Sequence, residues 1–207
     1  MAVNNNPKIS TNGLVLCLDL ANVRSYPGSG TTVNDLSGNG KTFSLYPDAT
    51  GYSSTYPNRF VFDGSRAVYK TDANVTTSSS STLVMVMYTT DTTGLLLSGV
   101  SVNGSGGFYV GAYYPWGGWY NGNAGSPSFL TDLASSSTMN TDNNFHMYEV
   151  KGINFSSWGS VWNFGYYGAG YEFNNGGVGF IAIYNRSISS DESAQNYYAL
   201  RKRFSLP

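Results

Sequence analysis

Charged residues are scarce in this sequence: they make up 11% of its 207 residues, against about a quarter in a typical globular domain. Its polarity comes instead from Asn, Ser, Thr and Gly, together with 17 Tyr, residue types that suit turns and sheet faces. Glu, a strong helix former, occurs only at Glu149, Glu172 and Glu192. This shortage of helix formers predicts little regular helix.

Cysteine and histidine each occur once, which limits the chemistry that the chain can perform. Cys17 has no partner for an internal disulfide and lies in an apolar run, so we interpret it as a small buried hydrophobe. His146 alone leaves no His-based catalytic triad and no His-rich zinc site to build.

The charge balance argues against a nucleic-acid partner. The net charge is −1, whereas nucleic-acid-binding domains usually carry a basic patch. The basic cluster at 201–203 lies near the carboxyl end, where it suits the last turn of a solvated helix.

The amino-terminal residues are polar and show no basic leader followed by an apolar run. We therefore expect no signal peptide, no membrane span, and synthesis in a host cytoplasm. Residues 1–12, which include Pro7, are interpreted as an extended arm. Residues 13–207 have the length of one large β domain that needs no disulfide or metal for its core.

Most of the remaining sequence consists of short apolar or alternating segments separated by Gly, Asn and Asp turns. This pattern predicts an all-β fold built as a two-sheet antiparallel sandwich. Segments 14–18 and 178–184 are continuous apolar runs, as in strands that are buried on both faces. The predicted strands are 14–18, 60–62, 67–69, 83–88, 95–97, 108–114, 145–153, 161–167 and 178–184.

A single helix is predicted near the carboxyl end. Ser189 and Glu192 have the spacing of a capping box, which marks the start of a helix. Ala194, Tyr197 and Tyr198 then follow at helical spacing, and the helix is expected to end near Phe204. We expect this helix to cover one edge or one end of the sandwich.

Several segments together resemble concanavalin A-like, laminin-G-type domains over roughly residues 13–204. The resemblance implies a jelly-roll sandwich in which the amino-terminal and carboxy-terminal strands pair, so that Leu14–Leu18 lies beside Val178–Tyr184. The segments that carry it are Gly13–Asp19, Ser25–Thr32, Asp35–Gly40, Phe60–Gly64, Asn144–Val150 and Phe180–Ser189.

The opening segments are similar to a branch of this family that is common in virion proteins of tailed bacteriophages. This implies a non-enzymatic structural protein of the virion: a capsid-decoration, head-fibre or tail-associated subunit. Its partners would be other virion proteins and further copies of itself, with no nucleic acid or membrane contact. The alternative is a carbohydrate-binding adhesin that contacts a glycan on the host surface.

An enzymatic role is not expected from the carboxylates. Many members of the wider superfamily are glucanases with Glu-x-Asp-x-x-Glu on one strand, which places carboxylates on one face for a retaining mechanism. Here Glu149 and Glu172 lie on separate segments, and neither has a carboxylate two positions away. We interpret Glu149 as paired or half-exposed, and we expect no catalytic residues.

Asp35, Asn39 and Asp63 are candidate calcium ligands, because calcium prefers oxygen donors. The favoured interpretation is that the two aspartates cap turns through local backbone hydrogen bonds. Two departures from the family pattern are Val33–Asn34, where relatives carry Trp, and Ser65–Arg66, where they carry acidic residues. The second departure weakens a calcium site, so no cofactor is expected.

Aromatic residues in segment 113–123 are the main binding candidates. Tyr and Trp present flat apolar faces with a polar edge, which suits sugar stacking or a protein interface. Burial in the core is an equally good interpretation of this group, and a better one for Trp158, Trp162, Tyr166, Tyr167 and Tyr171. The candidate contact residues are Tyr113, Tyr114, Trp116, Trp119, Tyr120 and Asn121.

Overall fold

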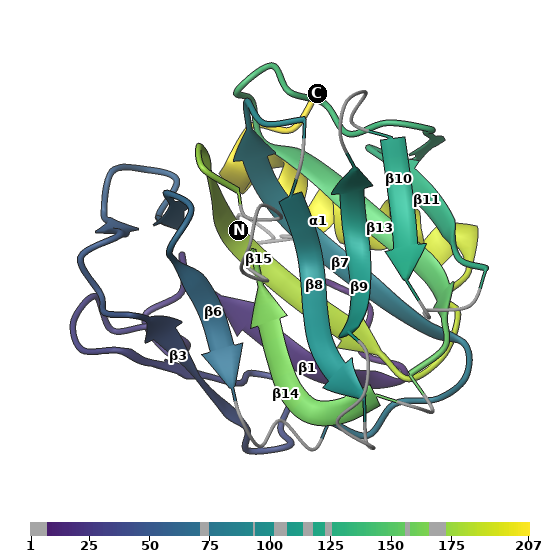
Figure 1. Ribbon diagram of the computed structural model, residues 1–207, viewed down its shortest axis with the longest axis horizontal. Helices are drawn as coiled ribbons and strands as arrows, with labels where there is room; N and C mark the ends of the chain where they lie inside the picture. Colours follow the sequence, from purple (N-terminus) through teal and green to yellow (C-terminus); the bar gives the residue numbers. More distant parts are fainter. Residues whose placement is uncertain are drawn as a thin grey trace, which may run out of the picture.

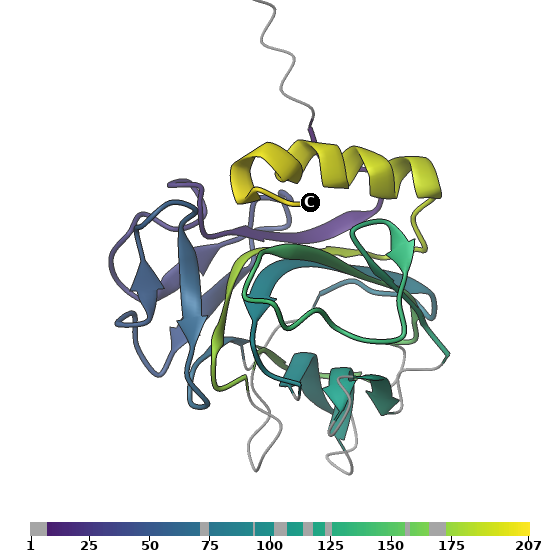
Figure 2. The same cartoon turned by 90° about the horizontal axis from the view of Figure 1, so that it is seen from above.

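Two antiparallel sheets packed face to face make up most of the structure, with one helix on the outer side of one sheet (Figures 1 and 2). This confirms the predicted all-β sandwich with a single carboxy-terminal helix. The computed structural model describes residues 8–70, 75–92, 94–101, 107–113, 118–122, 126–155, 158–165 and 173–207.

The eight-stranded sheet contains most of the segments that were predicted to be strongly buried. Its strands follow the order β12-β11-β13-β7-β15-β5-β4, and β1 also pairs with β15. The strands are β1 (Leu14–Asp19), β4 (Tyr52–Ser53), β5 (Arg59–Phe62), β7 (Ser81–Thr89), β11 (Ser128–Thr131), β12 (Ala134–Ser135), β13 (His146–Ile153) and β15 (Gly176–Tyr184).

The seven-stranded sheet has the order β10-β9-β8-β14-β6-β3-β2. Each of the predicted strands coincides with a strand in one of the two sheets, whereas β2, β3, β4, β10, β11 and β12 were not predicted. The strands are β2 (Thr32–Asn34), β3 (Thr42–Tyr46), β6 (Ala67–Lys70), β8 (Gly94–Ser101), β9 (Gly107–Tyr113), β10 (Gly118–Gly122) and β14 (Trp158–Phe164).

The amino-terminal and carboxy-terminal strands pair as expected. In the register of β1 and β15, Leu16 lies opposite Ile183 and Leu18 opposite Ile181. These four side chains belong to the core between the sheets. Cys17 points the other way, into the cluster under the helix, and burial raises the pKa of its thiol to about 12. Its predicted role as a buried hydrophobe is confirmed.

The capping box at the start of α1 (Ser190–Phe204) is present as predicted. The Ser189 side chain accepts a hydrogen bond from the Glu192 N–H, and the Glu192 carboxylate accepts one from the Ser189 N–H at 2.9 Å. This arrangement satisfies two backbone donors at the start of the helix. Among the described residues, no helix is long and apolar enough to cross a membrane.

The position of α1 differs from the prediction. It lies across the outer face of the eight-stranded sheet and does not cover an edge or an end (Figure 2). The helix buries Tyr197, Leu200 and Phe204 against apolar side chains of β7, β13 and β15. Tyr198, which was predicted to share the apolar stripe, is 55% exposed. The buried stripe contains the polar residues Ser193 and Asn196 instead, because both make hydrogen bonds beneath the helix.

Burial on both sides explains the imperfect alternation in β13. Tyr148 and Val150 face the core between the sheets, whereas Met147 packs beneath the helix. Ile153 is six positions after Met147, so regular alternation would put both on one face, yet Ile153 lies in the core between the sheets. The register with β7 shifts between Lys151 and Ile153, where Gly152 has a φ of +80°. This bulge reverses the face of the next residue.

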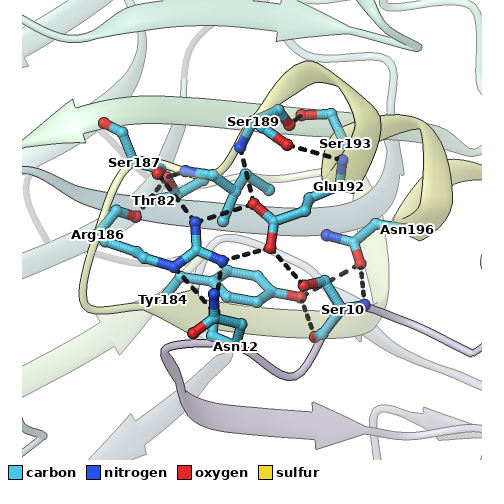
Figure 3. A network of polar contacts seen from close by, with 11 residues as sticks. Ser10, Asn12, Thr82, Tyr184, Arg186, Ser187, Ser189, Glu192, Ser193 and Asn196 are labelled. Atoms are coloured by element: carbon cyan, nitrogen blue, oxygen red, sulfur yellow. Dashed lines mark hydrogen bonds and ion pairs between the residues drawn. The ribbon is translucent and has the colours of Figure 1, made fainter.

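Residues 8–12 of the predicted arm bind to their own domain through a polar network (Figure 3). The Ser10 N–H donates to Asn196 Oδ1 at 2.8 Å, and the Ser10 hydroxyl donates to Glu192 Oε1 at 2.8 Å. Arg186 donates from Nη2 to the Asn12 carbonyl at 2.9 Å and also pairs with Glu192. The network therefore joins this segment to both β15 and α1; residues 1–7 lie outside the described part.

Gly179 allows the helix to approach the sheet closely. A Cβ atom at this position would lie 2.2 Å from Phe204 Cε1, so any larger residue would displace the ring. We predict that Phe204→Ala destabilises the domain by about 3–5 kcal/mol, because it leaves a cavity between helix and sheet. Urea unfolding followed by circular dichroism measures this change.

Tyr198→Ala on the exposed side of the same helix is the control, with an expected change within about 0.5 kcal/mol. Equal losses of stability in the two variants would contradict this account of how the helix docks.

Candidate functional site

The predicted contact segment forms an antiparallel hairpin at one end of the seven-stranded sheet. Tyr113 at the end of β9 lies opposite Gly118, and Tyr120 in β10 lies opposite Gly111. Trp119 and Asn121 also lie in β10, whereas Tyr114 and Trp116 fall outside the described residues. The sequence did not predict β10, because glycines at its ends are typical of turns.

A second group of polar and aromatic residues lies on the outer face of the seven-stranded sheet. In β3, Phe43 and Leu45 are buried, while Ser44 and Tyr46 are exposed. Ser44 lies opposite Tyr69 in β6, and Tyr69 lies opposite Asn163 in β14. The rings of Tyr46 and Tyr69 have centroids 5.6 Å apart. We call Ser44, Tyr46, Tyr69 and Asn163 the outer patch.

The outer patch presents hydroxyl and amide groups beside two aromatic rings, and none of its four residues carries a formal charge. Such a surface suits an uncharged polar partner, either sugar hydroxyls or a protein surface. The outer patch was not predicted, because no strand was expected over residues 42–46. The signal was the alternation of Thr42-Phe43-Ser44-Leu45-Tyr46.

The two sheets differ in what covers them. Helix α1 and residues 8–12 lie over the eight-stranded sheet (Figure 2). In the part of the chain that the structure describes, no helix lies over the seven-stranded sheet.

One row of paired residues connects the outer patch with the hairpin. Asn163 lies opposite Ser98 in β8, which lies opposite Tyr109 in β9, which lies opposite Gly122 in β10. β3 and β10 are five strand spacings apart, or about 24 Å at ~4.8 Å per spacing. A partner that contacts both regions must span this distance.

Glu149, one of the two predicted non-catalytic carboxylates, is buried beneath α1. Its Oε1 accepts a hydrogen bond from the Ser193 hydroxyl at 2.8 Å and lies 3.1 Å from Lys151 Nζ. Burial raises the pKa of Glu149 above its ordinary value. The prediction that Glu149 is paired is confirmed, although the side chain is buried rather than half-exposed. Glu172 lies outside the described residues.

His146 has partners that the sequence analysis did not foresee. Its Nδ1 lies 2.5 Å from Asp132 Oδ2, and its Nε2 lies 3.0 Å from Asp142 Oδ1. Burial alone would lower the pKa of His146, but hydrogen bonds and charge from both carboxylates outweigh it and raise the pKa. The two carboxylates therefore favour the protonated, cationic form of the buried imidazole.

This imidazole joins three separate segments. Asp132 lies in the turn between β11 and β12, where Asp132 and Leu133 have φ values of 48° and 73°. Its other oxygen accepts the Met147 N–H at 2.9 Å. Asp142 precedes β13 by four residues. The cluster therefore holds an unusual non-glycine turn at the edge of the sheet.

The calcium candidates lie in two separate turns. Asp35 Oδ1 accepts the N–H groups of Ser37 and Cys17, both at 2.8 Å, and Asn39 donates to the Val15 carbonyl. Turn capping by Asp35 is thus confirmed, and it also links the turn to β1.

Asp63 caps the other turn. It accepts the Ser65 N–H at 3.2 Å and forms an ion pair with Arg66. Among the described residues, no three His, Cys, Asp or Glu side chains are grouped to hold a metal ion.

Of the aromatic residues between 158 and 171 that were expected in the core, only some are described. Trp162 is buried and stacks on Phe155 with centroids 5.1 Å apart, which confirms the core interpretation for this residue. Trp158 lies in β14, and Tyr166, Tyr167 and Tyr171 fall outside the described residues.

Comparisons with known proteins identify similar folds only among solved structures. No family model and no curated protein matches the chain. Trypanosoma rangeli sialidase with 2,3-difluorosialic acid is similar at a TM-score of 0.54 and 14% identity, over 93% of this chain and 33% of the sialidase chain. The same sialidase with the inhibitor DANA gives a TM-score of 0.53 and 17% identity, over 95% and 34%.

Domain 4 of AbnA, a GH43 arabinanase from Geobacillus stearothermophilus in complex with arabinotriose, has 14% identity over 90% of this chain and 98% of that domain. Its TM-score of 0.47 supports no further conclusion. The chain spans about a third of the length of the sialidase chains. At these identities the likeness establishes the β-sandwich fold alone.

The buried His146 cluster predicts a specific dependence of stability on pH. The pKa of His146 is raised in the folded protein, so its contribution to stability is complete below about pH 6.5, the unfolded pKa. It is lost as the pH rises through the folded pKa. We expect His146→Gln to lose about 3 kcal/mol at pH 6 and much less at alkaline pH.

Urea unfolding at several pH values measures this difference. Because His146 is the only histidine in the chain, its imidazole resonance in NMR gives the pKa directly. A measured pKa below about 6.5 would contradict the assignment.

Proposed function

We propose that this chain is a non-enzymatic structural protein of a tailed-bacteriophage virion, as a capsid-decoration, head-fibre or tail-associated subunit. The observation that carries the proposal is the spatial grouping of the segments that resemble laminin-G-type virion domains. The segments in β1 and β15 pair directly, and the segment in β5 pairs with β15. Asp35, in a further segment, accepts the Cys17 N–H in β1. The resembling segments thus form one connected framework.

The arrangement of carboxylates supports a role without catalysis. Retaining glycosidases place two carboxyl groups about 5–5.5 Å apart across the bond that is cleaved. Here Glu149 is engaged beneath the helix, Glu192 is paired with Arg186, and Asp19 is paired with Arg203 at 2.7 Å. Asp132 and Asp142 bind the buried His146. Each of these described carboxylates binds a partner side chain of the same domain.

The partners proposed for this role are other virion proteins and further copies of the chain. The low proportion of charged residues supports protein contacts over contacts with nucleic acid or membrane. The outer patch and the β9–β10 hairpin lie on the sheet that α1 leaves uncovered, so they are the proposed contact surfaces.

Localisation in purified particles tests the structural role. We expect the protein to be present in many copies per particle by quantitative mass spectrometry, and at one fixed position by antibody labelling in the electron microscope. A soluble enzyme from the same infected cells serves as the control for contamination. A protein that is abundant in the lysate but absent from particles would refute the proposal.

A carbohydrate-binding adhesin is the second candidate, and the outer patch favours it. Tyr46 is 47% exposed and its ring lies beside that of Tyr69. Paired aromatic rings with adjacent hydroxyl and amide groups suit the apolar faces and hydroxyls of a neutral sugar. Ser44 and Asn163 supply these polar groups.

Glycan-array binding with purified protein tests this second candidate. We predict that Tyr46→Ala weakens binding of neutral glycans about tenfold, because an exposed aromatic contact is typical of a binding hot spot. Tyr198→Ala, on the helix, should leave binding unchanged. If the wild-type protein binds no glycan, the adhesin role is wrong while the structural role is unaffected.

A further inference from the structure

β10 is the terminal strand of the seven-stranded sheet (Figure 1). All five of its residues, Gly118–Gly122, pair with β9, and among the described strands it pairs with no other. In such a position, half of the backbone N–H and C=O groups of a strand point away from the sheet. These groups form a template for another strand.

β1, which among the described strands pairs only with β15, has its free edge bonded to Asp35, Leu36 and Asn39. The other three ends of the two sheets are much shorter than β10. β12 and β4 have two residues each, and β2 has three. Proteins protect sheet edges from pairing by very short strands, by charged side chains or by proline. β10 has five residues with the sequence Gly-Trp-Tyr-Asn-Gly, so it has none of these protections.

The absence of charge extends well beyond β10. Residues 92–131 contain no Asp, Glu, Lys, Arg or His, and this range includes β8, β9 and β10. In a two-fold symmetric contact, each side chain near the axis faces its own copy. A charged edge would repel itself in such a contact, whereas this edge does not. The net charge of −1 adds little repulsion between whole copies.

We infer that β10 is a self-association edge, at which β10 of a second copy of this chain pairs in antiparallel orientation. Two seven-stranded sheets would then join into one continuous sheet around a two-fold axis. With the axis at Tyr120, Gly118 faces Gly122 of the partner, and Tyr120 faces its own copy. The inference goes beyond the proposed function, since it holds wherever the protein acts.

Analytical ultracentrifugation of the full chain, at about 1–500 µM, tests the inference, because a single five-residue strand forms an interface smaller than a standard one. The wild type should dimerise reversibly. Tyr120→Lys should weaken the dimer about tenfold or more through like-charge repulsion. Tyr198→Lys is the control: it places the same change on the exposed side of α1, away from the seven-stranded sheet, and should leave the dimer unchanged.

A charge-reversal pair makes the test specific. Tyr120→Lys and Tyr120→Glu should each be monomeric alone, and their mixture should form a heterodimer, which a merely unfolded variant would not do. Should Tyr120→Lys not fold, amide hydrogen exchange in the wild type should show protection of β10 that rises with protein concentration. A wild type that stays monomeric throughout would overturn the inference. So would concentration-independent exchange, a dimer that survives Tyr120→Lys, or equal weakening by Tyr198→Lys.

Discussion

Burial of the eight-stranded sheet on both faces is the constraint on which the rest of the structure depends. Its inner face packs on the seven-stranded sheet and its outer face packs beneath α1. This is why β1 and β15 are continuous apolar runs although both belong to an antiparallel sheet, in which one solvated face is common. It also requires that any polar group beneath the helix has a partner close by.

Most polar groups beneath α1 find partners by joining distant parts of the chain, although Glu149 Oε2 and Asn196 Nδ2 have no hydrogen-bond partner among the described residues. The Tyr184 hydroxyl donates to the Ser10 carbonyl at 2.9 Å, and Glu192 connects Ser10 with Arg186 (Figure 3). Hydrogen bonds from Arg186 lower the pKa of Glu192 to about 2. Residues 8–12, the end of β15 and α1 are thus held together at one site.

Features encoded locally could be read from the sequence. The apolar runs of β1 and β15, the capping box at Ser189 and the turn at Asp63–Gly64 each depend on neighbouring residues, and each appears where expected. Features that depend on distant contacts could not be read. The docking of α1 on a sheet face requires the small Gly179 in another element, and the cluster at His146 brings together three segments.

Several short strands also could not be predicted from the sequence. β2, β4 and β12 have two or three residues each and leave no periodic pattern, while glycines mark β10 as a turn. For the site, the sequence identified the aromatic segment of the hairpin but not the outer patch. Tyr46 and Tyr69 are 23 positions apart in the chain, so only the pairing of β3 with β6 brings their rings together.

The few charges of this protein serve mainly to hold the fold together. Arg203 links α1 to Asp19 at the end of β1, and Arg186, just after β15, pairs with Glu192 in α1. His146 links the β11–β12 turn to β13. Charges used in this way do not contribute to repulsion between molecules. The described strands of the seven-stranded sheet contain a single charged residue, Lys70 in β6. These ion pairs therefore lie around the eight-stranded sheet and α1, while the opposite sheet is built almost entirely from uncharged residues.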